Sequence, residues 1–357
     1  MKKLSRFFSE KLKRLTPYTP GEQPKDMKYI KLNTNESPFK PSENAINCAK
    51  KATESLNLYP DPECRQLTEK IASLLGVDYD EVLVTNGSDE ILNFAFIAFC
   101  DAACGAAFPD ITYGFYPVFA DLNGVEYTKI PLNDDFTVDI SKYFNLNKTI
   151  FIANPNAPTG IALTQNEIEE ILKNNPCNVV VIDEAYVDFG GQSCVPLIKK
   201  YDNLLVTQTF SKSRSMAGAR LGFGVGSKEI IKDLNTVKYS TNPYNINKMT
   251  MAAGIGILED NDYVLNNCKE IIKNREFTVK ELEKLGFVLT NSKTNFVFAK
   301  HLKISGKQLY LKLKENGILV RHFDKPKISE YNRITIGTLD EMKILISTTK
   351  KILEENE

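Results

Sequence analysis

The 357-residue sequence contains no tryptophan and only two histidines, His301 and His322. Neither histidine has a partner at the spacing of metal ligands, so we expect no metal site. A Ser-His-Asp or Cys-His mechanism is also not favoured, because no nucleophile lies in an elbow motif. The seven cysteines include no Cys-X-X-Cys pair, which is typical of reduced thiols in a cytoplasmic protein.

The sequence also lacks an excess of charge and any long apolar run. Lys+Arg and Asp+Glu both total 45, so nothing indicates a basic surface for nucleic acid. No apolar run approaches the roughly 18 residues that a membrane helix needs. The basic N-terminal stretch has no apolar core of the kind that a secretory signal requires. We therefore expect neither nucleic acid nor a membrane as a partner, and a cytoplasmic location.

Short β-branched runs that alternate with periodic stretches predict an α/β fold. Helices are expected over 88–100 and from Thr164, where Thr164 and Glu167 form a capping box. Because the predicted strands are apolar throughout, both faces of their sheet should be buried, as in a mainly parallel sheet sandwiched by helices. The predicted strands are 82–85, 149–153, 178–182, 204–207 and 221–225.

A change of texture after about residue 260 predicts a second, smaller α+β domain at the C-terminus. It begins with a long charged helix over roughly 260–285. We expect three parts in the chain: an N-terminal arm (1–30), a large domain (31–258) and a small domain (259–357) that packs with the N-terminal segment. The basic arm is expected to pack on a partner subunit rather than to lie on a membrane.

Polar residues follow four of the predicted strands of the large domain, and Arg220 comes directly before the fifth. Because the carboxyl ends of parallel strands meet at one edge of a sheet, ligands bind there and these residues should gather. The groups are Gly87-Ser88-Asp89, the segment 154–160, Asp183 to Tyr186, Thr209 to Lys212, and Arg220.

Each of these features alone has an ordinary structural interpretation, as a helix cap, an ion pair or a solvated lysine. Together, an anion site, a strand-end carboxylate, a lysine and an arginine are the parts of a pyridoxal phosphate site. The lysine bonds covalently to the cofactor aldehyde, and the carboxylate keeps the pyridine nitrogen protonated. The phosphate needs hydrogen-bond donors and a cation.

A series of motifs along the whole chain resembles the histidinol-phosphate aminotransferases, which are class I/II, fold-type-I pyridoxal phosphate enzymes. The motifs are LNTNESP (32–38), LYPDP (58–62), TNGSDE (85–90), TYGFY (112–116), NPNAPTG (154–160), DEAYVDF (183–189), TFSKSRSMAGARLGF (209–223), KTNFVF (293–298) and RITIGT (333–338). The resemblance implies a homodimer that transfers an amino group from L-histidinol phosphate to 2-oxoglutarate, in histidine biosynthesis.

The resemblance also implies residue roles. Lys212 would bond to the cofactor and carry the proton, Asp183 would pair with the pyridine nitrogen, and Tyr186 would hydrogen-bond the ring hydroxyl. Tyr113 would stack on the ring, and Tyr59 would reach the phosphate of the partner subunit. The phosphate would be held by Ser88 and Asp89 through backbone N–H groups, and by Ser211 and Arg220. Substrate would be bound by Arg333, Arg321, Tyr18 and Asn35.

One residue departs from the family pattern, since Ala157 stands where the family usually has an asparagine that bonds the ring hydroxyl. Either Asn156 substitutes for it, or Tyr186 carries that bond alone.

Alternative functions remain open: an aromatic-amino-acid aminotransferase, a threonine-phosphate decarboxylase, or a non-catalytic regulator that binds pyridoxal phosphate. A nucleotide-dependent oxidoreductase is less favoured, because the phosphate loop of such enzymes is missing. The RITIGT segment favours the histidine-pathway enzyme.

Overall fold

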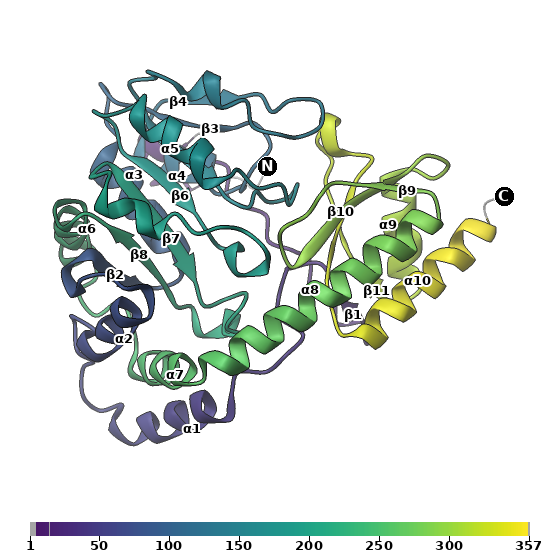
Figure 1. Ribbon diagram of the computed structural model, residues 1–357, viewed down its shortest axis with the longest axis horizontal. Coiled ribbons are helices and arrows are strands. Elements are labelled where there is room, and N and C mark those ends of the chain that lie inside the picture. Colours follow the sequence, from purple (N-terminus) through teal and green to yellow (C-terminus); the bar gives the residue numbers. More distant parts are fainter. Residues whose placement is uncertain (1–4, 14, 356–357) are drawn as a thin grey trace.

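The computed structural model describes residues 5–13 and 15–355; residues 1–4 and 14 of the predicted arm lie outside the described residues. The chain forms a larger and a smaller body, and the long helix α8 (Asn261–Lys284) runs between them (Figure 1). This α/β architecture confirms the predicted fold class. The proposed division of the chain at residues 30 and 258 stays a prediction.

The larger body is built on a seven-stranded sheet with the strand order β2-β8-β7-β6-β5-β3-β4. β8 runs antiparallel to both of its neighbours, and all other neighbours are parallel. The predicted mainly parallel sheet is therefore confirmed. Its strands are β2 (Val82–Thr85), β3 (Ala106–Pro109), β4 (Tyr127–Ile130), β5 (Thr149–Ala153), β6 (Val180–Asp183), β7 (Leu204–Thr209) and β8 (Gly222–Gly226).

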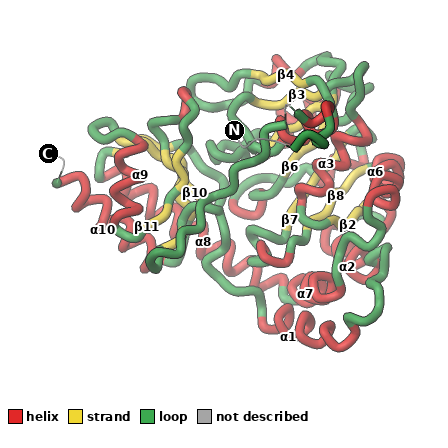
Figure 2. Tube along the Cα trace, turned by 180° about the vertical axis from the view of Figure 1, so that it is seen from behind, coloured by secondary structure: helices red, strands yellow, loops and turns green. Residues whose placement is uncertain are grey.

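Both faces of this sheet are buried, because successive strand residues enter different cores. Val180 and Ile182 belong to one apolar cluster, and Val181 between them belongs to another. Figure 2 shows helices on both sides of the sheet. The helices of the larger body are α1 (Glu43–Ala52), α2 (Arg65–Leu75), α3 (Ser88–Phe99), α4 (Tyr116–Asn123), α5 (Gln165–Lys173), α6 (Lys228–Thr241) and α7 (Lys248–Glu259).

The smaller body holds an antiparallel sheet with the order β12-β13-β10-β9, and α8 leads into it. The N-terminal strand β1 (Ile30–Lys31) pairs in parallel with β11 (Ile318–Leu319), so the N-terminal segment packs on this body. Its other elements are β9 (Phe287–Leu289), β10 (Phe296–His301), α9 (Gly306–Glu315), β12 (Arg321–His322), β13 (Asn332–Thr335) and α10 (Leu339–Glu354).

Short 3₁₀ helices complete the secondary structure. They are η1 (Glu10–Leu12), η2 (Thr53–Ser55), η3 (Tyr79–Glu81), η4 (Ile140–Tyr143), η5 (Val187–Phe189), η6 (Val195–Lys199), η7 (Ala217–Ala219) and η8 (Pro326–Ile328). Among the residues that the structure describes, every helix is too short or too polar to cross a membrane.

The topology brings the polar strand ends to one edge of the large sheet. Asp183 at the end of β6 lies beside Ala153 of β5 and Thr207 of β7. Gly222 at the start of β8 pairs with both Thr85 and Thr209. The carboxyl ends of β2, β5, β6 and β7 therefore point the same way, as the sequence predicts.

Candidate active site

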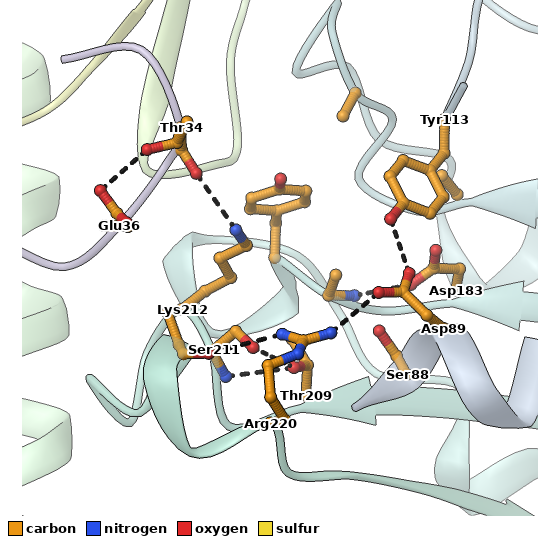
Figure 3. A pocket seen from close by; sticks show the side chains of 15 residues that line it. Thr34, Glu36, Ser88, Asp89, Tyr113, Asp183, Thr209, Ser211, Lys212 and Arg220 are labelled. Atoms are coloured by element: carbon orange, nitrogen blue, oxygen red, sulfur yellow. Dashed lines mark hydrogen bonds and ion pairs between the residues drawn. The ribbon is translucent and has the colours of Figure 1, made fainter. Parts of the chain in front are cut away.

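A cavity of about 280 Å³ opens at this edge of the sheet (Figure 3). Among the side chains that line it are those of helix α3, of the loops after β6 and β7, and of the segment after β1. Eight residues predicted for the site line it together: Ser88, Asp89, Tyr113, Asp183, Tyr186, Ser211, Lys212 and Arg220. Ala157, at the position of the family asparagine, also lines the cavity, as do Thr34 and Glu36, which were not predicted to do so.

Lys212 extends into the cavity from a loop that is fixed on both sides. Its Nζ atom donates to the carbonyl of Thr34 at 3.4 Å and lies 5.8 Å from the centre of the Tyr186 ring. Before it, the N–H of Ser211 donates to the Thr209 hydroxyl; after it, the Ser213 hydroxyl donates to Asp188. The amine is therefore held at the cavity while its backbone is anchored to the sheet.

Asp183 is a buried carboxylate with a fixed orientation. It is 5% exposed, and its Oδ1 atom accepts from the N–H of Ala185 at 3.2 Å. Its Oδ2 atom accepts from the hydroxyl of Tyr116, also at 3.2 Å. Burial raises the pKa of Asp183 to about 7, and Asp89 adds to this effect, whereas the two hydrogen bonds and Lys212 oppose it. Such a carboxylate is suited to a cationic partner, which favours its ionised form.

This raised pKa leads to a prediction for the ligand-free protein. Between about pH 4 and 7 the folded state keeps a proton on Asp183 that the unfolded chain, with an ordinary aspartate pKa of about 3.9, has released. The contribution of Asp183 to the free energy of unfolding therefore falls as the pH rises through this window. Asp183→Asn should stabilise the protein, relative to the unchanged chain, more at about pH 8 than at about pH 5 in urea unfolding. A difference that is independent of pH would contradict the prediction.

The start of α3 forms an anion site with Arg220. Gly87, with φ +74°, precedes the helix, and Ser88 and Asp89 supply its first N–H groups. A Cβ atom on Gly222 would lie 2.4 Å from the nitrogen of Ser88, so glycine is required for β8 to pass this close to the helix. Arg220 adds a guanidinium group, and the arrangement suits a phosphate.

The side chain of Asp89 contacts two other residues that were predicted for the site. These contacts were not predicted from the sequence. The Asp89 carboxylate accepts from the Tyr113 hydroxyl at 2.6 Å and from Nη2 of Arg220 at 2.9 Å. Burial and this carboxylate raise the pKa of Tyr113 well above its usual value. The Asp89 side chain thus positions both the aromatic ring and the cation.

Asn35, predicted to bind substrate, is buried and contacts Tyr186 instead. Its amide donates to the Tyr186 hydroxyl at 2.9 Å, and its Oδ1 atom accepts from Thr335 at 3.1 Å. It does not line the cavity. The geometry supports a role in orienting Tyr186 rather than a substrate contact.

Asn156 does not take the place of the asparagine that Ala157 replaces. Its amide donates to the Ile111 carbonyl at 3.0 Å and to Thr159 at 2.9 Å, and its oxygen accepts from Thr112 at 2.8 Å. These bonds hold it in the loop, whereas the Ala157 side chain lines the cavity. The structure favours the alternative in which Tyr186 carries the ring-hydroxyl bond alone.

The two predicted substrate arginines are neighbours on adjacent strands of the smaller body. Arg321 and Arg333 pair in register, and both guanidinium carbons lie 5.7 Å from the ring centre of Phe323. Nη2 of Arg333 donates to the carbonyl of Asn33 at 3.1 Å, while its buried Nε atom has no protein partner among the described residues. The pair is suited to an anionic group.

The N-terminal segment covers these arginines. The guanidinium of Arg321 donates to the carbonyls of Thr19 and Pro20, at 3.3 and 3.4 Å. The ring of Tyr18 stacks on Phe115 at 4.2 Å and lies 6.4 Å from the Tyr113 ring. Tyr18 therefore lies next in sequence to the residues that Arg321 contacts, and its ring is near Tyr113 of the cavity wall; its role in binding substrate stays a prediction.

Tyr59, predicted to act in the partner subunit, lies outside the cavity of its own chain. It is 78% exposed and stacks on Tyr244 with ring centres 4.6 Å apart. Its role across a dimer stays a prediction.

Comparison with known proteins places the chain in a family. Residues 27–348 match the family model of class I and II aminotransferases. The histidinol-phosphate aminotransferase of Brachyspira hyodysenteriae is 50% identical over 350 residues, which is 98% of this chain and 99% of that protein.

Solved structures agree with this comparison. The histidinol-phosphate aminotransferase of Clostridium acetobutylicum is 25% identical, with a TM-score of 0.85 over 91% of this chain and 99% of that one. The Sinorhizobium meliloti enzyme, solved in complex with pyridoxal-5'-phosphate, shares the fold at 22% identity, with a TM-score of 0.85 over 92% of both chains. The chain therefore belongs to the class I and II aminotransferases and, within them, to the histidinol-phosphate aminotransferase family.

Proposed function

We propose that this protein is a pyridoxal phosphate-dependent aminotransferase of histidine biosynthesis. It transfers the amino group of L-histidinol phosphate to 2-oxoglutarate, giving imidazole-acetol phosphate and glutamate. The observation that carries the proposal is the presence of Lys212 and the buried carboxylate of Asp183 in one cavity, beside an anion site at the start of α3. The named relatives support the choice of substrate.

The residues of the cavity fit pyridoxal phosphate. A buried carboxylate with a raised pKa needs the cationic partner that a protonated pyridine nitrogen provides. The first turn of α3, Ser211 and Arg220 suit the phosphate, and Tyr113 offers an aromatic face. When bound, the protonated ring of the cofactor withdraws electrons from the substrate carbon that loses its proton.

The residues of this chain then have distinct tasks. Lys212 would hold the cofactor through its aldehyde group, and its amine would carry the proton at the substrate α-carbon. Asp183 would hold the proton on the ring nitrogen. Tyr186 would donate to the ring hydroxyl, and the Asn35 amide fixes the Tyr186 hydroxyl oxygen for that contact. Ser88 and Arg220 would hold the phosphate of the cofactor.

The arginine pair accounts for the use of two different anions at one site. Histidinol phosphate carries a phosphate and no carboxylate, whereas glutamate carries two carboxylates. Guanidinium groups form bidentate hydrogen bonds with both kinds of anion, and Arg333 and Arg321 lie side by side. Arg333 is expected to make the stronger contact, because its Nε atom is buried without a protein partner among the described residues.

Replacing Arg333 with lysine should weaken the binding of both substrates. Lysine keeps the charge but loses the planar pair of donors, so we expect KM to rise about 10- to 100-fold for both, with a smaller change in kcat. Steady-state kinetics in which histidinol phosphate and 2-oxoglutarate are varied in turn measure this. Arg65→Lys, at an exposed arginine paired with Glu63, is the matched control. An unchanged KM for both substrates in Arg333→Lys would exclude this role.

Half-reactions test the proposed substrate. The protein loaded with pyridoxal phosphate should be yellow and should lose its colour when histidinol phosphate is added without acceptor. 2-Oxoglutarate should restore it. Histidinol phosphate should react faster than phenylalanine or threonine phosphate. Dominant turnover of phenylalanine would favour the aromatic aminotransferase, and release of carbon dioxide from threonine phosphate would favour the decarboxylase.

We also propose that the enzyme is a cytoplasmic homodimer, in which Tyr59 completes the site of the partner. The exposure of Tyr59, Leu56 and Leu58 on one loop supports this proposal, because clustered exposed apolar residues are typical of interfaces. Sedimentation of the loaded protein should give the mass of two chains, whereas a monomer that turns over histidinol phosphate would exclude the dimer.

A further inference from the structure

Tyr116 is a buried tyrosine whose hydroxyl contacts the functional carboxylate. It begins α4, and its side chain is fully buried. Its ring packs against Phe108, Phe151 and Tyr113, with centres 5.7, 5.8 and 5.7 Å away. The hydroxyl donates to Oδ2 of Asp183 at 3.2 Å. The packed rings leave the phenol fixed against the carboxylate, and Tyr116 does not itself line the cavity.

The hydrogen bond from Tyr116 is one of two that the Asp183 carboxylate accepts from described residues. The N–H of Ala185 holds the other oxygen at 3.2 Å. The charged groups that act on Asp183 are Asp89 from α3, which disfavours its charge, and Lys212 from the loop after β7, which favours it. The Tyr116 phenol is a neutral donor. Its hydrogen bond favours the ionised form of Asp183, and it brings no positive charge that would compete with a protonated ring nitrogen for the carboxylate.

We propose that Tyr116 is a positioning residue that holds Asp183 ionised and oriented toward the pyridine nitrogen of the cofactor. This inference rests on the proposed function. Tyr116 itself touches neither cofactor nor substrate, and acts only through the Asp183 carboxylate. Without its hydroxyl, Oδ2 of Asp183 loses its side-chain donor, and burial then disfavours the charged form more strongly.

The variant Tyr116→Phe tests the proposal, because it removes one buried oxygen and keeps the ring. The sequence offers a matched control in Tyr143→Phe. Tyr143 is equally buried, and its hydroxyl has no hydrogen-bond partner among the described residues. Both variants lose the same atom from a packed ring, but only the first loses a bond to Asp183.

The first measurement is the dissociation constant of pyridoxal phosphate from each protein, with no substrate present. We expect Tyr116→Phe to raise it about 10-fold, as for the loss of a hydrogen bond to a charged group, and Tyr143→Phe to leave it unchanged. The second measurement repeats the titration with 1-deazapyridoxal phosphate, in which carbon replaces the ring nitrogen. For this probe Tyr116→Phe and the unchanged chain should bind alike.

Each outcome decides the matter. Weakened binding of pyridoxal phosphate alone supports the proposal. Unchanged binding of pyridoxal phosphate, or equal weakening of both probes, overturns it, since the second result indicates only a structural role for the phenol. An equal effect of Tyr143→Phe also overturns it. Failure of the unchanged chain to bind pyridoxal phosphate would instead overturn the proposed function.

Discussion

Lys212→Ala should lower kcat/KM for histidinol phosphate at least about 10⁴-fold, because it removes both the covalent anchor and the proton carrier. The Lys212 side chain lines the cavity, and its amine donates to the Thr34 carbonyl. Alanine leaves no group there that can move a proton. The measurement is single-turnover conversion of histidinol phosphate by the loaded protein.

The fold should survive this substitution. The Lys212 side chain is only partly buried and forms no ion pair among the described residues, so circular dichroism and the unfolding temperature should change little. Lys228→Ala is the matched control, since Lys228 pairs with Asp78 and Asp80 on the surface. Turnover by Lys212→Ala at the level of the control would refute the assignment of this lysine.

Asp183→Asn should lower kcat about 10³-fold, which corresponds to about 4 kcal/mol at the transition state. Asparagine is nearly isosteric, but its neutral amide cannot stabilise a protonated ring nitrogen. The buried setting of Asp183 makes this loss large, because little water is present to replace the charge. The rate of the half-reaction with histidinol phosphate measures it.

The comparison variant is Asp135→Asn, at an aspartate whose carboxylate accepts from the N–H and hydroxyl of Thr137 in an exposed turn. We expect no change in its half-reaction rate. If Asp183→Asn keeps full activity, the ring nitrogen does not depend on this carboxylate, and the account of the site fails.

The strands of the central sheet could be predicted where burial on both faces selects β-branched and apolar residues. Thr149–Ala153 and Leu204–Thr209 are of this kind. Two strands escaped prediction. Ala106–Pro109 contains two alanines and a proline, and Tyr127–Ile130 lies at the sheet edge with an exposed centre. The first is apolar but contains no β-branched residue, and the second lacks apolar continuity.

The site could be predicted where it depends on topology. Asp183 and Lys212 follow parallel strands, so the sheet brings them to the same edge whatever the loops do. Contacts that depend on loop conformation could not be predicted. The hydrogen bond from Asn35 to Tyr186 joins residues 151 positions apart. The hydrogen bonds of the Asn156 side chain depend on the backbone conformation of its loop, which no sequence pattern indicates.

The most direct test of the account is a crystal structure of the protein loaded with pyridoxal phosphate. It should show density continuous from the Lys212 amine to the cofactor carbon, the Asp183 carboxylate within about 3 Å of the ring nitrogen, and the phosphate at the first turn of α3. A cofactor bound to another lysine, or a ring nitrogen turned away from Asp183, would contradict it.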